Sequence, residues 1–214
     1  MIFLRITNKP SCFLQSGFKK DKLMKVEDYK MRILFEMDKK DYVPDGSVYS
    51  RPSARAVIIK DGKIAMVYSK KYNYYKFPGG GIEADECMED ALIREVLEET
   101  GLCVIRDSIQ EYGQVHRIQK GTKEDIFIQD NYYFLCSVKK DIEQQNLDKY
   151  EADEGFTLEF LKPQLAIDVN RETILDDFTQ IMLEREALVL ELLIQEGYFE
   201  CGGKLHENTQ NDIV

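Results

Sequence analysis

Acidic side chains are concentrated in one short segment of the sequence, residues 85–100, which contains seven acids and a single base, Arg94. The acids are Asp85, Glu86, Glu89, Asp90, Glu95, Glu98 and Glu99. Apolar residues recur in this segment at helical spacing, Asp85 is a suitable N-cap, and Gly101 follows directly after the end. The segment therefore predicts a helix in which many like charges lie close together. Such a cluster either forms a solvated face or requires a compensating cation.

Three of these glutamates are predicted to share one side of the helix. At about 100° per residue, Glu98 and Glu99 fall roughly 60° and 40° to either side of Glu95. This arc overlaps the apolar ridge that ends at Val96, so Glu95 and Glu99 border the buried stripe. An ordinary solvated face lies opposite that stripe. Because Mg²⁺ and Mn²⁺ prefer carboxylate, carbonyl and water ligands, the arrangement favours one of these ions.

A glycine-rich loop, Phe-Pro-Gly-Gly-Gly at residues 77–81, precedes this helix. The glycines leave the backbone unobstructed, so a carbonyl of the loop can approach the same ion. A bound divalent ion polarises a phosphoryl oxygen and lowers the pKa of water, while a neighbouring carboxylate removes the proton. Loop and helix together thus predict metal-dependent chemistry at phosphorus. The alternative interpretation is a flexible loop followed by a charge-rich surface helix.

Residues 80–102 resemble the MutT-like Nudix box of the Nudix hydrolases. The matching positions are Gly80, Glu86, Arg94-Glu95-Val96, Glu98-Glu99 and Gly101-Leu102, with the spacing that the box requires. The resemblance implies hydrolysis of the diphosphate linkage in a nucleoside diphosphate derivative, by attack of water at phosphorus. It also implies Mg²⁺ or Mn²⁺ as the cofactor and a small nucleotide or diphosphate metabolite as the substrate.

The resemblance implies a role for each matching residue. Glu95, Glu98 and Glu99 are the implied metal ligands, together with the carbonyl of Gly80, and one of the glutamates is also the general base. Arg94 is expected to orient a glutamate through a bidentate contact.

Three further residues are expected to have a structural role or to support the metal ligands without binding the ion themselves. These are Glu86, Gly79 and Gly101. Glu86 is placed in this group because about 12 Å of helix rise separates it from Arg94.

Many relatives carry one more metal-binding carboxylate beyond the box. Glu154 is the candidate here because it lies just ahead of the strand-like residues 156–160, and Glu151 is the second candidate. The alternative is a solvated acidic loop.

Cations and aromatic residues before the glycine loop are the candidates for substrate binding. Lys70 and Lys71 are suited to phosphate, Tyr74 to stacking on a base, and Arg55 to reaching a phosphate from a flanking strand. The alternatives are a solvated hairpin tip with packing tyrosines and, for Arg55, an ion pair with a surface acid. His116 has a pKa suited to proton transfer, but a lone histidine on a strand is more often structural.

The pattern of elements predicts an α+β fold. Asp61-Gly62 between two apolar runs predicts a β-hairpin. Strands are expected at residues 32–37, 54–59, 63–68, 102–105, 111–117, 126–128, 131–138 and 156–161. A long last helix is expected from about Arg171 to Glu196, with apolar residues that include Ile174. The resemblance implies a Nudix fold, an α/β/α sandwich with a mixed sheet and a catalytic loop-helix-loop.

The chain of 214 residues is expected to form one Nudix domain over residues 31–200, including the C-terminal helix. Residues 1–30 are expected to be an N-terminal arm, disordered or preceding the true start, and residues 201–214 a tail. The last helix is expected to pack on its own sheet, and a homodimer through this helix is the competing use.

Charge and composition narrow the location and the partners. Twenty-nine basic and 39 acidic residues give a net charge of −10, which disfavours binding to nucleic acid and to anionic membranes. The opening apolar run stops at Arg5, which is too short for a signal peptide, and no run approaches the roughly 20 residues of a membrane span. Five cysteines without a C-x-x-C pair indicate reduced thiols and a cytoplasmic protein.

Two rival functions remain on the same scaffold. The first is a nucleotide-sensing Nudix module without turnover, against which the intact glutamates argue. The second is a prenyl-diphosphate isomerase, which requires a cysteine and a further acid facing the substrate carbon.

Overall fold

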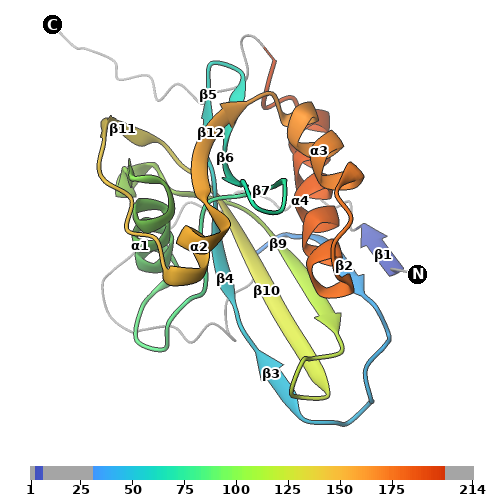
Figure 1. The fold of residues 1–214 in the computed structure, drawn as a ribbon. Helices are drawn as coiled ribbons and strands as arrows, with labels where there is room; N and C mark the ends of the chain where they lie inside the picture. The colour runs from blue at the N-terminus through green and yellow to red at the C-terminus, as the bar shows by residue number, and fades with distance from the viewer. Residues whose placement is uncertain (1–2, 7–30, 201–214) are drawn as a thin grey trace, which may run out of the picture.

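The fold has three layers, with β-sheets between helices on both sides (Figure 1). The structure is a computed structural model, which describes residues 3–6 and 31–200. Helix α1 (Met88–Thr100) lies on one side of the sheets, and α3 (Pro163–Glu172) and α4 (Asp177–Gln195) lie on the other. The predicted α+β fold, an α/β/α sandwich, is confirmed. Of the predicted N-terminal arm, residues 3–6 form strand β1, and the rest lies outside the described residues, as does the predicted tail.

The larger sheet is mixed, as predicted, and its strands run in the order β1-β2-β9-β10-β3, with β4 also paired to β10. Its strands are β1 (Phe3–Ile6), β2 (Ile33–Asp38), β3 (Val48–Ser50), β4 (Ser53–Val57), β9 (Gln110–Gln119) and β10 (Ile126–Leu135). The β1/β2 and β9/β10 pairs are antiparallel, whereas β2 runs parallel to β9, and β3 and β4 run parallel to β10. Strands β3 and β4 therefore pair with successive parts of β10, at the end of the strand order opposite β1.

Strand β10 is continuous where the sequence predicts two strands, 126–128 and 131–138. The polar residues Gln129 and Asp130 do not interrupt it, because each has a side-chain partner. Gln129 accepts a hydrogen bond from Arg185, and Asp130 contacts His116 on the neighbouring strand. The strand ends at Leu135, and Val138 begins a separate strand.

Two smaller sheets complete the β-structure of the described residues. One has the order β12-β6-β5 with β7 paired to β6, and the other pairs β11 with β8. Their strands are β5 (Ile59–Lys60), β6 (Lys63–Ser69), β7 (Tyr74–Lys76), β8 (Leu102–Val104), β11 (Val138–Ile142) and β12 (Phe156–Leu161). The predicted hairpin at Asp61-Gly62 is confirmed between β5 and β6. The predicted strand 54–59 is wrong as one element, because β4 ends at Val57 and pairs with β10 in the larger sheet. Asp61 and Gly62 both have positive φ, of 52° and 68°, as in the two-residue turns that match strand twist.

The predicted long C-terminal helix is wrong at its start. Helix α3 ends at Glu172, residues 173–176 break the helix, and α4 begins at Asp177. The carboxylate of Asp176 accepts hydrogen bonds from the backbone N–H groups of Phe178 and Thr179, at 3.0 and 3.1 Å. This N-cap starts a new helix and turns the chain. Ile174, predicted on the apolar face, is 89% exposed in the connection.

Helix α1 differs from its prediction at one end. It starts at Met88 rather than Asp85, and Cys87 occupies the N-cap position. The residues before it form a turn, in which the Glu83 N–H donates to the Glu86 carboxylate at 2.9 Å. The helix ends before Gly101, which has a φ of 74°, as predicted. A short helix, α2 (Lys149–Glu154), was not predicted.

The two larger of the three hydrophobic clusters among the described residues lie on opposite sides of the sheets. Leu92 and Val96 of α1 pack with Ala54 and Ala56 of β4, whereas Val57 belongs to the core beneath α4. Successive residues of β4 thus face opposite layers. Packing on both faces fixes the position of this strand, to which the glycine loop is hydrogen-bonded. Among residues 3–6 and 31–200, no helix has both the length and the apolar character to cross a membrane.

Candidate active site

A cavity of about 960 Å³ opens between α1, the glycine loop and α4. Its walls include residues 49–52 and 79–83, the polar side of α1, and residues of α2, β9, β10 and α4. The three box glutamates and Arg94 all line it. The two long segments that are far apart in the sequence, α1 and α4, therefore face one cavity.

The glycine loop is fixed to β4 by backbone hydrogen bonds. Ala54 N donates to the carbonyl of Gly80 at 3.0 Å, and Ala56 N donates to the carbonyl of Pro78 at 2.8 Å. Gly79 has a φ of 126°, and a Cβ at this position would collide with the carbonyl oxygen of Ala54. Only glycine allows the loop to lie this close to the strand.

Arg94 joins Glu95 and Glu98 on the cavity side of α1. Its Nη1 donates to Oε1 of Glu95 at 2.9 Å and to Oε2 of Glu98 at 3.2 Å. Its Nε and Nη2 form a bidentate contact with Glu86. The turn before α1 brings Glu86 back to Arg94, which the rise of a continuous helix would have prevented. The predicted bidentate contact of Arg94 is thus made to Glu86, while the two metal-site candidates receive single bonds.

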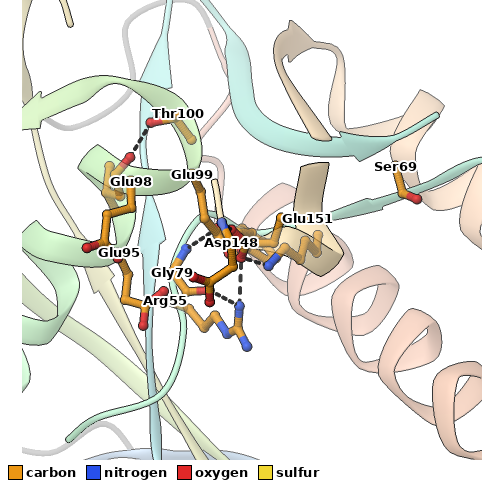
Figure 2. A network of polar contacts seen from close by, with 12 residues as sticks. Arg55, Ser69, Gly79, Glu95, Glu98, Glu99, Thr100, Asp148 and Glu151 are labelled. Carbon is orange, nitrogen blue, oxygen red and sulfur yellow. Dashed lines mark hydrogen bonds and ion pairs between the residues drawn. The ribbon is translucent and has the colours of Figure 1, made fainter. Parts of the chain in front are cut away.

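Glu99 points away from this pair and into the protein. Its side chain is 1% exposed, against 16% for Glu95 and 36% for Glu98. Lys76 Nζ donates to one carboxylate oxygen, and the Gly79 N–H donates to the other at 2.9 Å. Burial raises the pKa of Glu99 to about 7, against the opposing charges of Lys76 and Arg55. Figure 2 shows Glu99 close to Gly79 and Arg55. Glu95 and Glu98 lie on the same helix as Glu99, to one side of this group.

The donor atoms around Arg94 have the chemistry of a divalent cation site. Two carboxylates converge on one guanidinium nitrogen, so their geometry already accommodates a positive charge. A Cβ at Gly80 would overlap the Glu95 carboxylate, so this backbone lies against the same group. Within the described ranges, no three acidic, histidine or cysteine side chains converge as a preformed metal cluster. The structure thus brings Glu95 and Glu98 together, but not Glu99.

Glu154 and Glu151 belong to α2, which also lines the cavity. The segment just before α2 contacts the end of α1, where the Asn146 N–H donates to the Glu98 carbonyl at 2.9 Å. Glu154 Oε2 accepts hydrogen bonds from Ser69 Oγ at 3.0 Å and from the Tyr74 hydroxyl at 2.8 Å. Glu151 is 4% exposed and closes the capping box of α2 with Asp148. Both carboxylates therefore have protein partners in this structure, and their predicted part in metal binding stays a prediction.

The predicted substrate-binding residues separate into two groups. Arg55 and Tyr74 line the cavity, and Arg55 Nη1 donates to the carbonyl of Gly79. Its Nε is buried without a hydrogen-bond partner in the described structure. Lys70 and Lys71 are exposed near the same hairpin, but they are not among the residues that line the cavity. His116 is also outside the lining, and its Nδ1 lies 2.8 Å from Asp130.

Sequence reasoning missed the residues on the α4 side of the cavity. These are Arg117 and Gln129 of the sheet, Phe127 beside them, and Phe178 and Arg185 of α4. It also missed Lys76, the partner of Glu99. A signal was available in β9, where Arg117 and Gln119 occupy the same face as Val115, a face that alternation assigns to the interior.

Comparison with known proteins identifies the family of the chain. A family model described as the NUDIX domain matches residues 50–178. An ADP-ribose pyrophosphatase of Methanocaldococcus jannaschii is 36% identical over 80 residues, which cover 35% of this chain and 44% of that protein. Nudix hydrolase 2 of Arabidopsis thaliana is 29% identical over 119 residues, which cover 53% and 40%. The chain spans less than half the length of these curated relatives.

Solved structures with a similar chain path include a NUDIX hydrolase from Nitrosomonas europaea, with a TM-score of 0.47 and 18% identity. The match covers 64% of this chain and 88% of that one. MutT from Bacillus halodurans has a TM-score of 0.46 and 15% identity, over 63% and 80% of the two chains. The family model spans more than half of the sequence and includes the glycine loop, α1 and α2. The chain therefore belongs to the Nudix family.

Proposed function

We propose that this protein is a metal-dependent pyrophosphohydrolase that cleaves the diphosphate linkage of a nucleoside diphosphate derivative. The substrate is a nucleotide or a nucleotide-like small metabolite, and water attacks at phosphorus. One observation supports this proposal above the others. Glu95 and Glu98 converge on one cationic side chain, the guanidinium of Arg94, beside the glycine loop and inside a cavity large enough for a nucleotide.

Mg²⁺ or Mn²⁺ would be held by Glu95, Glu98 and the carbonyl of Gly80, with Glu99 joining if its carboxylate turns from Lys76. When bound, the ion neutralises phosphate charge and acidifies water. The chain itself contributes further positive charge, since Arg55 and Lys76 line the same cavity. These cations suit an anionic diphosphate better than a neutral ligand.

Glu98 is the best placed of the three glutamates to take the proton of the attacking water. Its carboxylate has the greatest exposure to the cavity, and one of its oxygens has no bond to Arg94. Partial burial raises its pKa, which makes its carboxylate a stronger base. Glu99 is less suited to this role, because Lys76 and Gly79 occupy both of its oxygens.

Partners and location follow from the same proposal. A protein with a net charge of −10 and a nucleotide-sized cavity is expected to act on small molecules, without binding nucleic acid or membranes, in the cytoplasm. A homodimer stays a proposal. In the described part of the chain, Cys87, Cys103 and Cys136 are free thiols, and none of them lines the cavity. This speaks against the prenyl-diphosphate isomerase, which needs a cysteine at the substrate.

A panel of substrates with product identification tests the proposal. The purified protein is incubated with Mg²⁺ or Mn²⁺ and with dNTPs, ADP-ribose, dinucleoside polyphosphates, nucleotide sugars or coenzyme A. Hydrolysis of a diphosphate bond, abolished by EDTA, is the expected result. Tight binding without any product would instead identify a sensor module, and an isomerised prenyl diphosphate would identify the rival enzyme.

A further inference from the structure

A layer of buried polar side chains lies between the larger sheet and α4, beside the hydrophobic core that the two elements share. We call it the polar layer, and its members are Arg117, Gln119, Gln129, Asn131, Arg185 and Glu186, each less than a tenth exposed. A helix normally covers a sheet through apolar side chains. Buried charges contribute little to stability compared with apolar residues of similar volume, so a layer of this kind calls for another explanation.

Most of the polar layer is satisfied internally. Arg185 forms an ion pair with Glu186 and donates to Gln129 and Asn131, at 3.1 and 2.6 Å. Glu186 also accepts a hydrogen bond from the Phe77 N–H at 3.0 Å. These contacts fix α4 to the sheet and to the start of the glycine loop. They leave no unpaired charge on Arg185.

Arg117 differs, because its charge has no counterpart within ion-pair distance among the described residues. Its Nε and Nη2 donate to the neutral oxygens of Gln119 and Phe178, and its Nη1 has no protein partner there. The guanidinium lies 4.6 Å from the ring centroid of Phe178 and 5.6 Å from that of Phe127. Burial, together with the charge of Arg185, lowers the pKa of Arg117.

This arginine and both of its aromatic neighbours line the cavity that also contains Glu98. We propose that Arg117, Phe127 and Phe178 form an anion-binding subsite, the arginine subsite, for a phosphate or carboxylate that the substrate carries away from the diphosphate. Such a group would accept hydrogen bonds from Nη1 and compensate the buried charge. The inference rests on the proposed function, and narrows its substrates to nucleoside diphosphate derivatives with an additional anionic group.

Matched pairs of ligands test the subsite directly. Coenzyme A and 3′-dephospho-coenzyme A differ by one phosphate, and UDP-glucuronate and UDP-glucose differ by one carboxylate. Binding to the metal-free protein is measured by calorimetry, so the result does not depend on turnover. In at least one pair, the wild-type protein is expected to bind the charged member about tenfold more tightly.

Two variants and one control assign that preference to Arg117. In Arg117→Gln the ratio of the two affinities is expected to fall towards one. Arg117→Lys keeps a charge but loses the planar guanidinium, so an intermediate ratio is expected. Arg171→Gln removes an exposed arginine of α3 that pairs with Glu184 and Glu191, and it should keep the wild-type ratio. Thermal unfolding shows whether each variant is folded. If Arg117→Gln does not fold, the affinity ratio of the folded Arg117→Lys variant tests the proposal instead.

The proposal is overturned if the charged members do not bind, if the wild-type ratio is near one in both pairs, or if the folded Arg117 variants keep the full preference. Hydrolysis of the same four compounds with Mg²⁺ is assayed in parallel. Absence of all hydrolysis would contradict the proposed function, whereas hydrolysis without a charge preference would contradict the arginine subsite alone.

Discussion

Glu98 is the residue at which the proposed chemistry is most directly tested. The Glu98→Gln variant removes the charge of a ligand and base without changing volume. We expect kcat to fall by at least about a hundredfold, with little change in the free energy of unfolding. Steady-state kinetics on the best substrate of the panel, with denaturant unfolding alongside, measure both quantities. Glu89→Gln makes the same change on the same helix, outside the cavity lining, and should keep wild-type kcat. Equal rates in both variants would contradict the assignment of Glu98.

His116 and Asp130 give a pH-dependent contribution to stability that is separate from catalysis. The hydrogen bond to Asp130 raises the pKa of His116 above its ordinary value of 6.5. Burial by itself would raise the pKa of Asp130. Hydrogen bonds from His116 and Gln114 outweigh it and lower the pKa below 3.8. The histidine contribution is complete below about pH 6.5 and is lost as pH rises through its folded pKa. The aspartate contribution is present above about pH 4 and is lost as pH falls through its folded pKa.

The pair therefore stabilises the fold most between about pH 4 and 6.5. Replacing His116 by Gln should lower the free energy of unfolding more at about pH 5.5 than at about pH 8.5, because the neutral histidine at high pH has lost its charge. Denaturant unfolding of both proteins at the two pH values measures the difference. The same loss at both values would show that the histidine is not charged in the folded protein.

At the scale of the element, the glycine loop depends on a close approach to β4. Gly79→Ala places a Cβ against the Ala54 carbonyl at a φ that L-residues rarely adopt. We expect a loss of roughly 1–3 kcal/mol in the free energy of unfolding and a fall in kcat, because the shifted loop releases the Glu99 carboxylate from the Gly79 N–H. Denaturant unfolding and kinetics measure the two effects.

Gly81→Ala is the matched control for this substitution. Its Cβ would meet the flexible end of Arg51, at 3.1 Å from Nε, and Gly81 has no positive φ. A cost well below that of Gly79→Ala is expected. If the two alanine variants are equally stable and active, the loop does not depend on its contact with β4.

Elements with strong local signals were predictable from the sequence. The Asp61-Gly62 turn, strand β12 and the end of α1 at Gly101 all carry such signals. The break before α4 was missed because residues 171–196 keep an apolar periodicity across it, and the Asp176 cap interrupts the helix without disturbing that pattern. Helix α2 has six residues, too few for periodicity to reveal.

Local sequence patterns also predict only part of the candidate site. Glu95 and Glu98 lie on one helix, so their shared side follows from helical geometry, whereas Glu99 of the same helix turns towards Lys76. The contacts of Glu99 with Lys76 and of Arg117 with Phe178 join positions 23 and 61 residues apart, which no local spacing encodes. The residues on the α4 side of the cavity therefore could not be predicted from local spacing, because they come together only when α4 packs on the sheet.

At the scale of the whole molecule, charges of both signs gather in the cavity walls. The protein carries a net charge of −10, yet buried cations line the cavity. These are Arg55, Lys76, Arg117 and Arg185. The same walls contain more acidic side chains than basic ones, so the attraction of an anionic ligand depends on a bound cation, and it weakens as salt rises. Glu95 and Glu98, which converge on Arg94, mark the part of the cavity best suited to that cation.

Divalent metal is expected to stabilise the entire fold through this pair. An ion that binds only the folded protein adds about 2.7 kcal/mol to the free energy of unfolding at a hundred times its Kd. Thermal unfolding in EDTA and in rising Mg²⁺ should show an increasing Tm, with sodium chloride of equal ionic strength as the control. Glu98→Gln should show a smaller increase, because one carboxylate is lost, whereas Glu89→Gln should match the wild type. An identical Tm in EDTA and in saturating Mg²⁺ would mean that Arg94 already satisfies Glu95 and Glu98 and that no ion replaces it.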